Sequence, residues 1–336
     1  MALGCQCGFD GSLLASALLV LSCLLASGCR CTDDRDPTPS GPAGTVAPAA
    51  PPLPSETESP QLLYLPDGGD QAPPTAPGGG ELRSAAPGTG RCPPEMVQVS
   101  GQFCIDRYES VLVDHRSGRL LSPYYHPTRA QTKQAYRRFK HNQLTGKMIM
   151  ERRVKVPDPP SWQLEQEFEP RAEVRAGAIP NGYLSADIAA LACRNAGKRL
   201  CTENEWVTAC RGSQSRQFPY GDTYINGACN VFREAHPAAV LHGNASIHHL
   251  DPRLNGLEVG GRPLLRPTGA TPRCRSQWGD DAVFDMVGNL AEWVDDPDGV
   301  FLGGFFSRST RAGCERRVAA HPREYFDYSL GMRCCR

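Results

Sequence analysis

The sequence carries no net charge, because 36 lysines and arginines balance 36 aspartates and glutamates. No global field therefore directs the chain toward nucleic acid or an anionic surface. The apolar run at residues 13–25 is too short for a helix that crosses a bilayer. The chain also lacks a Gly-x-Ser-x-Gly segment, a phosphate-binding loop and a dinucleotide fingerprint, so the motifs of three common enzyme classes are missing.

One segment departs from this charge balance. Residues 129–155 hold nine basic side chains, and Glu151 is the only acid among them. The segment lacks the Gly-rich and aromatic features of nucleic-acid sites, so we predict no nucleic-acid partner. The segment is either a solvent-exposed excursion from the domain, which we favour, or an anion-binding face.

The N-terminus has the pattern of an export signal. The apolar run ends in ASGC at residues 26–29, where small residues precede a cysteine. We predict a lipoprotein-type signal peptide at residues 1–29 and acylation of Cys29, which places the protein on a membrane of the bacterial cell envelope, on its periplasmic or cell-surface side. The alternative is an ordinary cleaved signal with an incidental cysteine.

Residues 30–90 form a separate region in composition. They are rich in Pro, Gly, Ala, Ser and Thr and have almost no aliphatic pattern. Such a stretch cannot bury enough apolar surface to offset its ordering entropy, so we predict a disordered tether. Residues 91–336 remain, a length that suits one large domain.

Local signals in this domain predict two helices and short strands. Ser185 is a helix cap before an amphipathic stretch at residues 185–193, and Gly197 suits the left-handed end. A capping box formed by Thr202 and Glu205 predicts a second helix, which ends by Gly212. Short apolar runs at residues 95–99 and 300–305 favour short strands between long loops.

Ten of the 15 cysteines lie in the domain. An even number behind an export signal predicts a disulfide framework. The domain contains no Cys-x-x-Cys unit, so a structural zinc site is disfavoured. The sequence alone leaves the pairing open.

Several motifs together resemble the formylglycine-generating enzyme, or sulfatase-modifying factor, family. They are GKRLCTENEW at residues 197–206, GNLAEW at 288–293 and GMRC at 331–334, with supporting matches at 96–109 and 218–222. The resemblance runs from about residue 92 to residue 336. It implies an α+β fold: the compact, loop-rich, disulfide-stabilised sulfatase-modifying-factor variant of the C-type-lectin-like fold.

The resemblance also implies two disulfide pairs. The resemblance pairs Cys193 with Cys334 and Cys210 with Cys314. The pairing of the remaining six cysteines stays open: Cys92, Cys104, Cys201, Cys229, Cys274 and Cys335.

A calcium site is a further implication of the resemblance. Its ligands would be the side chains of Asp285 and Glu292 and the backbone carbonyls of Gly288 and Leu290, hard oxygen donors of the kind that Ca²⁺ takes. The alternative is that both acids are hydrogen-bonded in a tight turn. A second family calcium site corresponds to Asn230 and Val231, but its downstream acidic partner has no clear counterpart.

The family's oxidase chemistry does not carry over. Those oxidases bind copper(I) through two thiolates in the segment that matches residues 303–313, and this segment contains no cysteine here. Cys314 matches a structural cysteine instead. A hydroxyl is no ligand for a soft metal ion, so copper is not expected.

A related iron-dependent sulfoxide synthase needs three histidines. The only local group here is His242, His248 and His249 near Asp251. The adjacent rings of His248 and His249 would point apart in a strand or helix, so a polar surface loop is favoured over a metal site.

The preferred function is an envelope-anchored, non-oxidase recognition or accessory module with structural calcium and an unknown protein or carbohydrate ligand. The alternative is an enzyme of the formylglycine-generating and non-heme metal oxidase superfamily, which acts on a protein or small molecule through a divergent site.

Overall fold

The computed structural model describes residues 92–231, 233–308 and 311–336. The predictions for the signal peptide, for Cys29 and for the tether at residues 30–90 fall outside this part of the chain. Among the residues it does describe, no helix combines the length and apolar character needed to cross a membrane.

The first of two four-stranded sheets joins the two ends of the domain. Its order is β1-β2-β14-β5, so the last strand lies between the N-terminal hairpin and a strand from the middle of the chain. Its neighbours are antiparallel to it. The strands are β1 (Met96–Val99), β2 (Phe103–Asp106), β5 (Arg199–Leu200) and β14 (Cys334–Cys335).

The second sheet has the order β12-β11-β10-β13. Its pair β10·β13 is parallel, with Glu292 opposite Gly331, so the GNLAEW and GMRC motifs lie side by side. The strands are β10 (Ala291–Trp293), β11 (Phe301–Leu302), β12 (Arg317–Val318) and β13 (Leu330–Met332).

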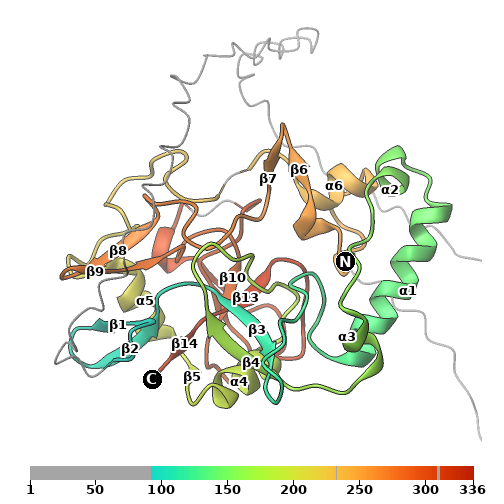
Figure 1. Ribbon diagram of the computed structural model, residues 1–336. Helices are drawn as coiled ribbons and strands as arrows, with labels where there is room; N and C mark the ends of the chain where they lie inside the picture. The colour runs from blue at the N-terminus through green and yellow to red at the C-terminus, as the bar shows by residue number, and fades with distance from the viewer. Residues whose placement is uncertain (1–91, 232, 309–310) are drawn as a thin grey trace, which may run out of the picture. The chain divides into compact units, whose positions relative to one another are not determined.

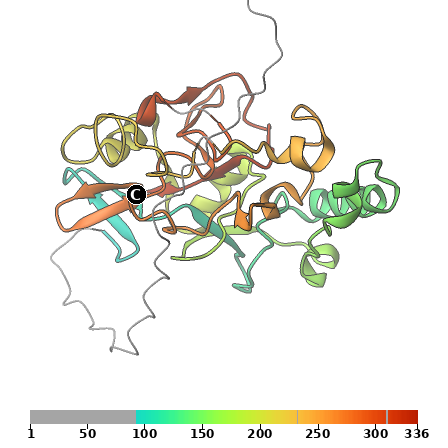
Figure 2. The same cartoon turned by 90° about the horizontal axis from the view of Figure 1, so that it is seen from above.

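Three two-stranded sheets and one helical excursion surround these sheets (Figure 1). The excursion lies between β3 and β4 and carries α1, α2 and α3 on one side of the domain, where both views show it (Figure 2). The two-stranded sheets are β3 (Ser110–Asp114) with β4 (Pro170–Val174), β6 (Glu258–Val259) with β7 (Arg262–Pro263), and β8 (Arg275–Trp278) with β9 (Asp281–Phe284).

The basic segment at residues 129–155 forms most of this excursion. It folds into α1 (Arg129–Thr145) and α2 (Ile149–Arg153), and α3 (Ser161–Glu165) follows. The sequence predicts no helix at residues 129–155, because this segment has almost no apolar stripe. Only Thr132 and Phe139 are buried along α1.

The two predicted helices are present. Ser185 caps α4 (Ala186–Asn195) by accepting a hydrogen bond from Ile188 N, and α4 ends two residues beyond the predicted boundary. The capping box of Thr202 and Glu205 starts α5 (Glu203–Arg211). Gly212, with φ of 68°, ends it. The remaining helical turns are α6 (Pro237–His242), η1 (Leu254–Gly256) and η2 (Gly313–Glu315).

Five disulfides cross-link the domain, and together they use all ten of its cysteines. They are Cys92–Cys104, Cys193–Cys334, Cys201–Cys335, Cys210–Cys314 and Cys229–Cys274. The second and fourth are the pairs that the resemblance implies. The fold is therefore α+β, loop-rich and disulfide-stabilised, as predicted.

Candidate functional site

A buried ion pair joins the three sequence motifs at the centre of the domain. Arg333 Nε and Nη2 each lie 2.7 Å from a carboxylate oxygen of Glu292, and Trp206 Nε1 donates to the same carboxylate at 2.7 Å. Arg333 also donates to the backbone carbonyls of Asp106 and Phe284. All three side chains of this network are fully buried. The pair thus links α5, β10 and the C-terminal segment.

Two more buried carboxylates belong to the same electrostatic cluster. Burial, reinforced by repulsion from Asp285 and Glu292, raises the pKa of Glu109 well above its usual range. Burial also raises the pKa of Asp285 to about 6. Glu109, Asp285 and Glu292 share the buried Arg333 guanidinium, so the ionised cluster carries excess negative charge.

The structure brings the two expected calcium segments into contact. Gly288 has φ of 82°, and a Cβ there would lie 2.3 Å from Val231 Cγ1 and 2.4 Å from the Asn230 carbonyl oxygen. Only glycine fits this approach. Asn289 N also donates to the Asn230 carbonyl at 3.0 Å. Leu290 is buried beside them.

The expected calcium ligands are already engaged in part. Asp285 Oδ2 accepts a hydrogen bond from Gly269 N at 2.7 Å, and Glu292 holds Arg333 and Trp206. This arrangement corresponds to the hydrogen-bonded alternative for both acids. Hard oxygen donors suit Ca²⁺, but both oxygens of Glu292 already accept from Arg333, so the residues fit a calcium ion only in part.

At the second candidate site the Asn230 side chain is fixed in orientation. Its Nδ2 donates to the Leu264 carbonyl at 2.8 Å and to Asn289 Oδ1 at 2.9 Å. Its Oδ1 is buried without a hydrogen-bond partner. A buried, unpaired oxygen is costly unless it has a ligand. This atom is the feature that a cation at Asn230 and Val231 would satisfy.

A cavity of about 370 Å³ lies along the segment that begins at residue 303. Its wall includes Ser307 and Arg308, the residues that stand where the family's oxidases have their thiol segment. We call it the aromatic–histidine pocket, because its remaining polar and aromatic lining consists of His236, His249, Phe301, Phe305, His321, Tyr325, Asp327, Tyr328 and Ser329.

The polar groups of this pocket are linked to one another. Tyr328 OH lies 3.1 Å from His236 Nε2, and His236 Nδ1 is buried without a partner. Tyr325 OH donates to Asp327 at 2.7 Å, and the His321 ring stacks on Tyr325 at 4.0 Å. Burial, together with the charge of His249, lowers the pKa of His236. The His236 ring is therefore neutral at neutral pH.

The sequence singled out only three residues of this pocket: Ser307, Arg308 and His249. Its residues come from segments separated by up to about a hundred positions, and no local spacing links them. The nearest signal was the GG pair at residues 303–304, which opens the segment that lines the pocket.

The prediction of a polar surface loop for the histidine group is wrong at two positions, because His242 and Asp251 are buried. His242 is buried, with Nδ1 2.7 Å from Glu151 Oε1 and Nε2 3.3 Å from Asp251 Oδ2. His248 packs on His242 at 4.8 Å, whereas His249 lines the aromatic–histidine pocket. Among the residues described, no three His, Cys, Asp or Glu side chains converge to hold a metal ion.

Comparison with known proteins identifies the family. The family model of the sulfatase-modifying factor enzyme 1-like domain matches residues 77–336, more than half of the chain. The chain belongs to this family. The comparison with curated proteins finds no match.

Two solved structures are similar to this sulfatase-modifying-factor chain. The alignment with the crystal structure of CarF covers 70% of this chain and 86% of the CarF chain, with 13% sequence identity and a TM-score of 0.33. The alignment with the structure of PvdO from Pseudomonas aeruginosa covers 70% of this chain and 80% of the PvdO chain, with 16% sequence identity and a TM-score of 0.31.

Within the sulfatase-modifying-factor domain, the described residues contain no free thiol. Every cysteine from Cys92 to Cys335 has a disulfide partner. Cys314 in particular is bound to Cys210. In the segment that matches the oxidases' thiol pair, Ser307 and Arg308 present a hydroxyl and a guanidinium to the pocket, and neither group is a ligand for copper(I).

Proposed function

We propose that this chain is a lipid-anchored protein of the bacterial cell envelope whose domain works as a recognition or accessory module without oxidase activity. The observation that carries the proposal is the state of the cysteines. All ten in the domain are in disulfides, and Ser307 and Arg308 stand on the pocket wall. The family's oxidases need two thiolates for copper(I), so copper is not expected as a cofactor.

The anchor rests on the sequence at residues 26–29. Acylation of Cys29 would tie the chain to the membrane, and the proline-rich region at residues 30–90 would act as a semi-extended spacer. The domain then faces the periplasm or the cell surface. Radiolabelled palmitate should enter the wild-type chain and be absent from Cys29→Ser, and equal labelling of both would remove the anchor.

The aromatic–histidine pocket is the proposed recognition site. Its volume of about 370 Å³ lies in the usual range of small-ligand pockets. Aromatic faces such as Tyr325 and Phe305 offer stacking surface, and Arg308 offers hydrogen-bond donors. This chemistry suits a sugar ring or an exposed side chain of a protein ligand.

Calcium is proposed as a structural ion of the adjacent loop. Asp285, Gly288, Leu290 and Glu292 would hold it, and the divalent charge would offset the surplus of buried carboxylates. Gly288 N donates to the Gly303 carbonyl at 3.0 Å, so this loop directly supports the pocket wall.

The decisive experiment tests the oxidase. The purified protein is supplied with copper(I), O₂ and a peptide that carries a sulfatase-type cysteine motif, and mass spectrometry follows the peptide. A copper-loaded family oxidase serves as the positive control. We expect the peptide to stay unmodified with this protein. Loss of sulfur with gain of an aldehyde would overturn the proposal.

A divergent enzyme is the second candidate, favoured by one observation. Tyr328 OH and His236 Nε2 lie 3.1 Å apart at the pocket wall, a geometry that allows proton transfer to a bound substrate. A metal inventory of the purified protein, compared with that of His236→Gln, tests whether this pocket holds a metal. A stoichiometric transition metal lost in His236→Gln would favour the enzyme.

A further inference from the structure

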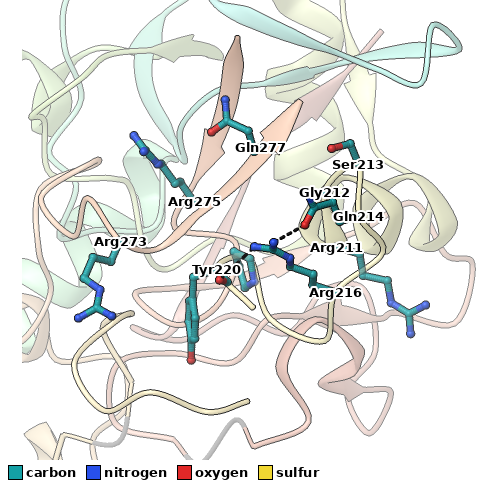
Figure 3. A pocket seen from close by; sticks show the side chains of 10 residues that line it. Arg211, Gly212, Ser213, Gln214, Arg216, Tyr220, Arg273, Arg275 and Gln277 are labelled. Atoms are coloured by element: carbon teal, nitrogen blue, oxygen red, sulfur yellow. Dashed lines mark hydrogen bonds between the residues drawn. The ribbon is translucent and has the colours of Figure 1, made fainter. Parts of the chain in front are cut away.

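A second cavity, of about 340 Å³, lies at the end of α5 and shares no lining residue with the aromatic–histidine pocket. Two chain segments form it: the loop at residues 211–220 and the segment at residues 273–277. Four arginines line it, and we call it the arginine pocket: Arg211, Arg216, Arg273 and Arg275 (Figure 3).

The positive charge of this pocket is largely uncompensated. None of its lining residues is an aspartate or glutamate. Arg211 is paired with Glu315 and points away from Arg273 and Arg275 in Figure 3. Arg216 donates to Gln214 and to the Tyr220 carbonyl, which are neutral.

The remaining two arginines, Arg273 and Arg275, are exposed, and neither pairs with a carboxylate in the described part of the chain. Exposed like charges repel one another weakly through water, and a bound anion would relieve that repulsion.

Disulfides hold both walls of the arginine pocket in place. Cys210 immediately precedes Arg211 and is bound to Cys314. Cys274 stands between Arg273 and Arg275 and is bound to Cys229. The backbones that carry three of the four guanidinium groups are thus covalently fixed.

Hydrogen bonds also connect the two walls. Ser213 N donates to the Gln277 carbonyl at 3.0 Å, and Trp278 Nε1 donates to the Ala209 carbonyl at 3.1 Å. A site whose backbone is ordered in advance loses less entropy when a ligand binds. The backbone of the arginine pocket is therefore ordered before a ligand binds.

The chemistry of the lining defines the ligand. A guanidinium fork matches the oxygens of a phosphate group and can bind two of them at once. The volume of about 340 Å³ exceeds what one phosphate fills, so there is room for the organic group attached to it. Tyr220, half-buried and stacked on Phe218 at 5.4 Å, offers an aromatic surface for that group.

We propose that the arginine pocket binds a phosphate monoester. The phosphate contacts the arginine side chains of this pocket, and the organic part lies toward Tyr220. The ester belongs either to a soluble molecule or to a lipid headgroup, which present the same chemistry to these side chains.

Calorimetric titration of the full-length protein tests this proposal with three probes: inorganic phosphate, glucose 1-phosphate, and vesicles of phosphatidylcholine with phosphatidic acid. We expect binding of glucose 1-phosphate, or of the vesicles, that is tighter than binding of inorganic phosphate and weakens as salt is added. Binding of glucose 1-phosphate assigns a soluble ligand, and binding of the vesicles alone assigns a headgroup.

Variants locate the binding. Removal of both exposed arginines in Arg273→Gln/Arg275→Gln should raise Kd by about a hundredfold, or about tenfold for each guanidinium removed. Arg194→Gln, an exposed arginine of α4 outside the pocket, should leave Kd unchanged. An unaltered melting temperature shows that the double variant is folded.

The proposal fails if no probe binds, if inorganic phosphate binds as tightly as the esters, or if Arg194→Gln weakens binding as much as the double variant does.

Discussion

Replacement of Glu292 by glutamine should destabilise the domain strongly. Glu292→Gln keeps the size of the side chain but removes the carboxylate that two nitrogens of the fully buried Arg333 contact, so only the charges of Glu109 and Asp285 remain near the guanidinium. Loss of one partner from a buried ion pair costs about 3–5 kcal/mol of unfolding free energy. The carbonyls of Asp106 and Phe284 still accept from Arg333, which places the expected loss at the lower end, about 3 kcal/mol.

A double-mutant cycle separates the ion pair from the effects of packing. Arg333→Met should also destabilise, because it leaves a buried carboxylate. Glu292→Gln/Arg333→Met removes both charges and should lose less than the sum of the single variants, by about 1–3 kcal/mol. The matched control is Glu203→Gln, which breaks an exposed pair with Arg317 and should cost at most about 1 kcal/mol.

Denaturant unfolding of the disulfide-intact protein, with a calcium chelator throughout, measures these differences. The chelator ensures that the ion pair alone is compared. A loss below about 1 kcal/mol for Glu292→Gln, or strict additivity in the double variant, would refute the reasoning.

Two further predictions concern calcium and pH. Calcium should raise the melting temperature of the wild type relative to chelator but not that of Asp285→Asn, which keeps the Glu292 ion pair; identical melting temperatures in the wild type would contradict the calcium proposal. Burial lowers the pKa of His126 from 6.5 to about 4, so the unfolded chain binds a proton that the folded domain does not. The free energy of unfolding should therefore fall by up to about 3 kcal/mol as pH drops from 6.5 toward 4, and less so in His126→Gln. His115→Gln, at an exposed position, should follow the wild type, and parallel profiles for all three would show that His126 is not responsible.

The predictions that succeeded were those with a local physical signal. A cap at Ser185 and a capping box at Thr202 and Glu205 fix helix starts within a few residues, whatever the rest of the fold does. Helix α1 had no comparable signal. It has two buried residues in 17, so its periodicity is not that of an amphipathic helix.

The site could be predicted only in part, for a related reason. The sequence predicted a metal site at Glu292 but not its ion pair with Arg333. Arg333 lies 41 residues further along the chain, and the parallel pairing of β10 with β13 brings it beside Glu292. The aromatic–histidine pocket is similar. His236, His321 and Tyr328 meet there only because long loops bring them together, and loop paths leave no periodic trace in a sequence.

The loop at residues 285–292, where we propose a calcium ion, and the aromatic–histidine pocket share a backbone connection, so the two proposed sites should not act independently. Gly288 N donates to the Gly303 carbonyl at 3.0 Å, and Phe306 N donates to the Asn289 carbonyl at 3.1 Å. Each bond ties a residue of the loop to the pocket wall. A cation that orders the loop also orders the wall, and so reduces the entropy that a ligand must lose on binding. Because linkage between binding sites is reciprocal, a ligand in the pocket should raise calcium affinity by the same factor by which calcium raises the affinity for the ligand.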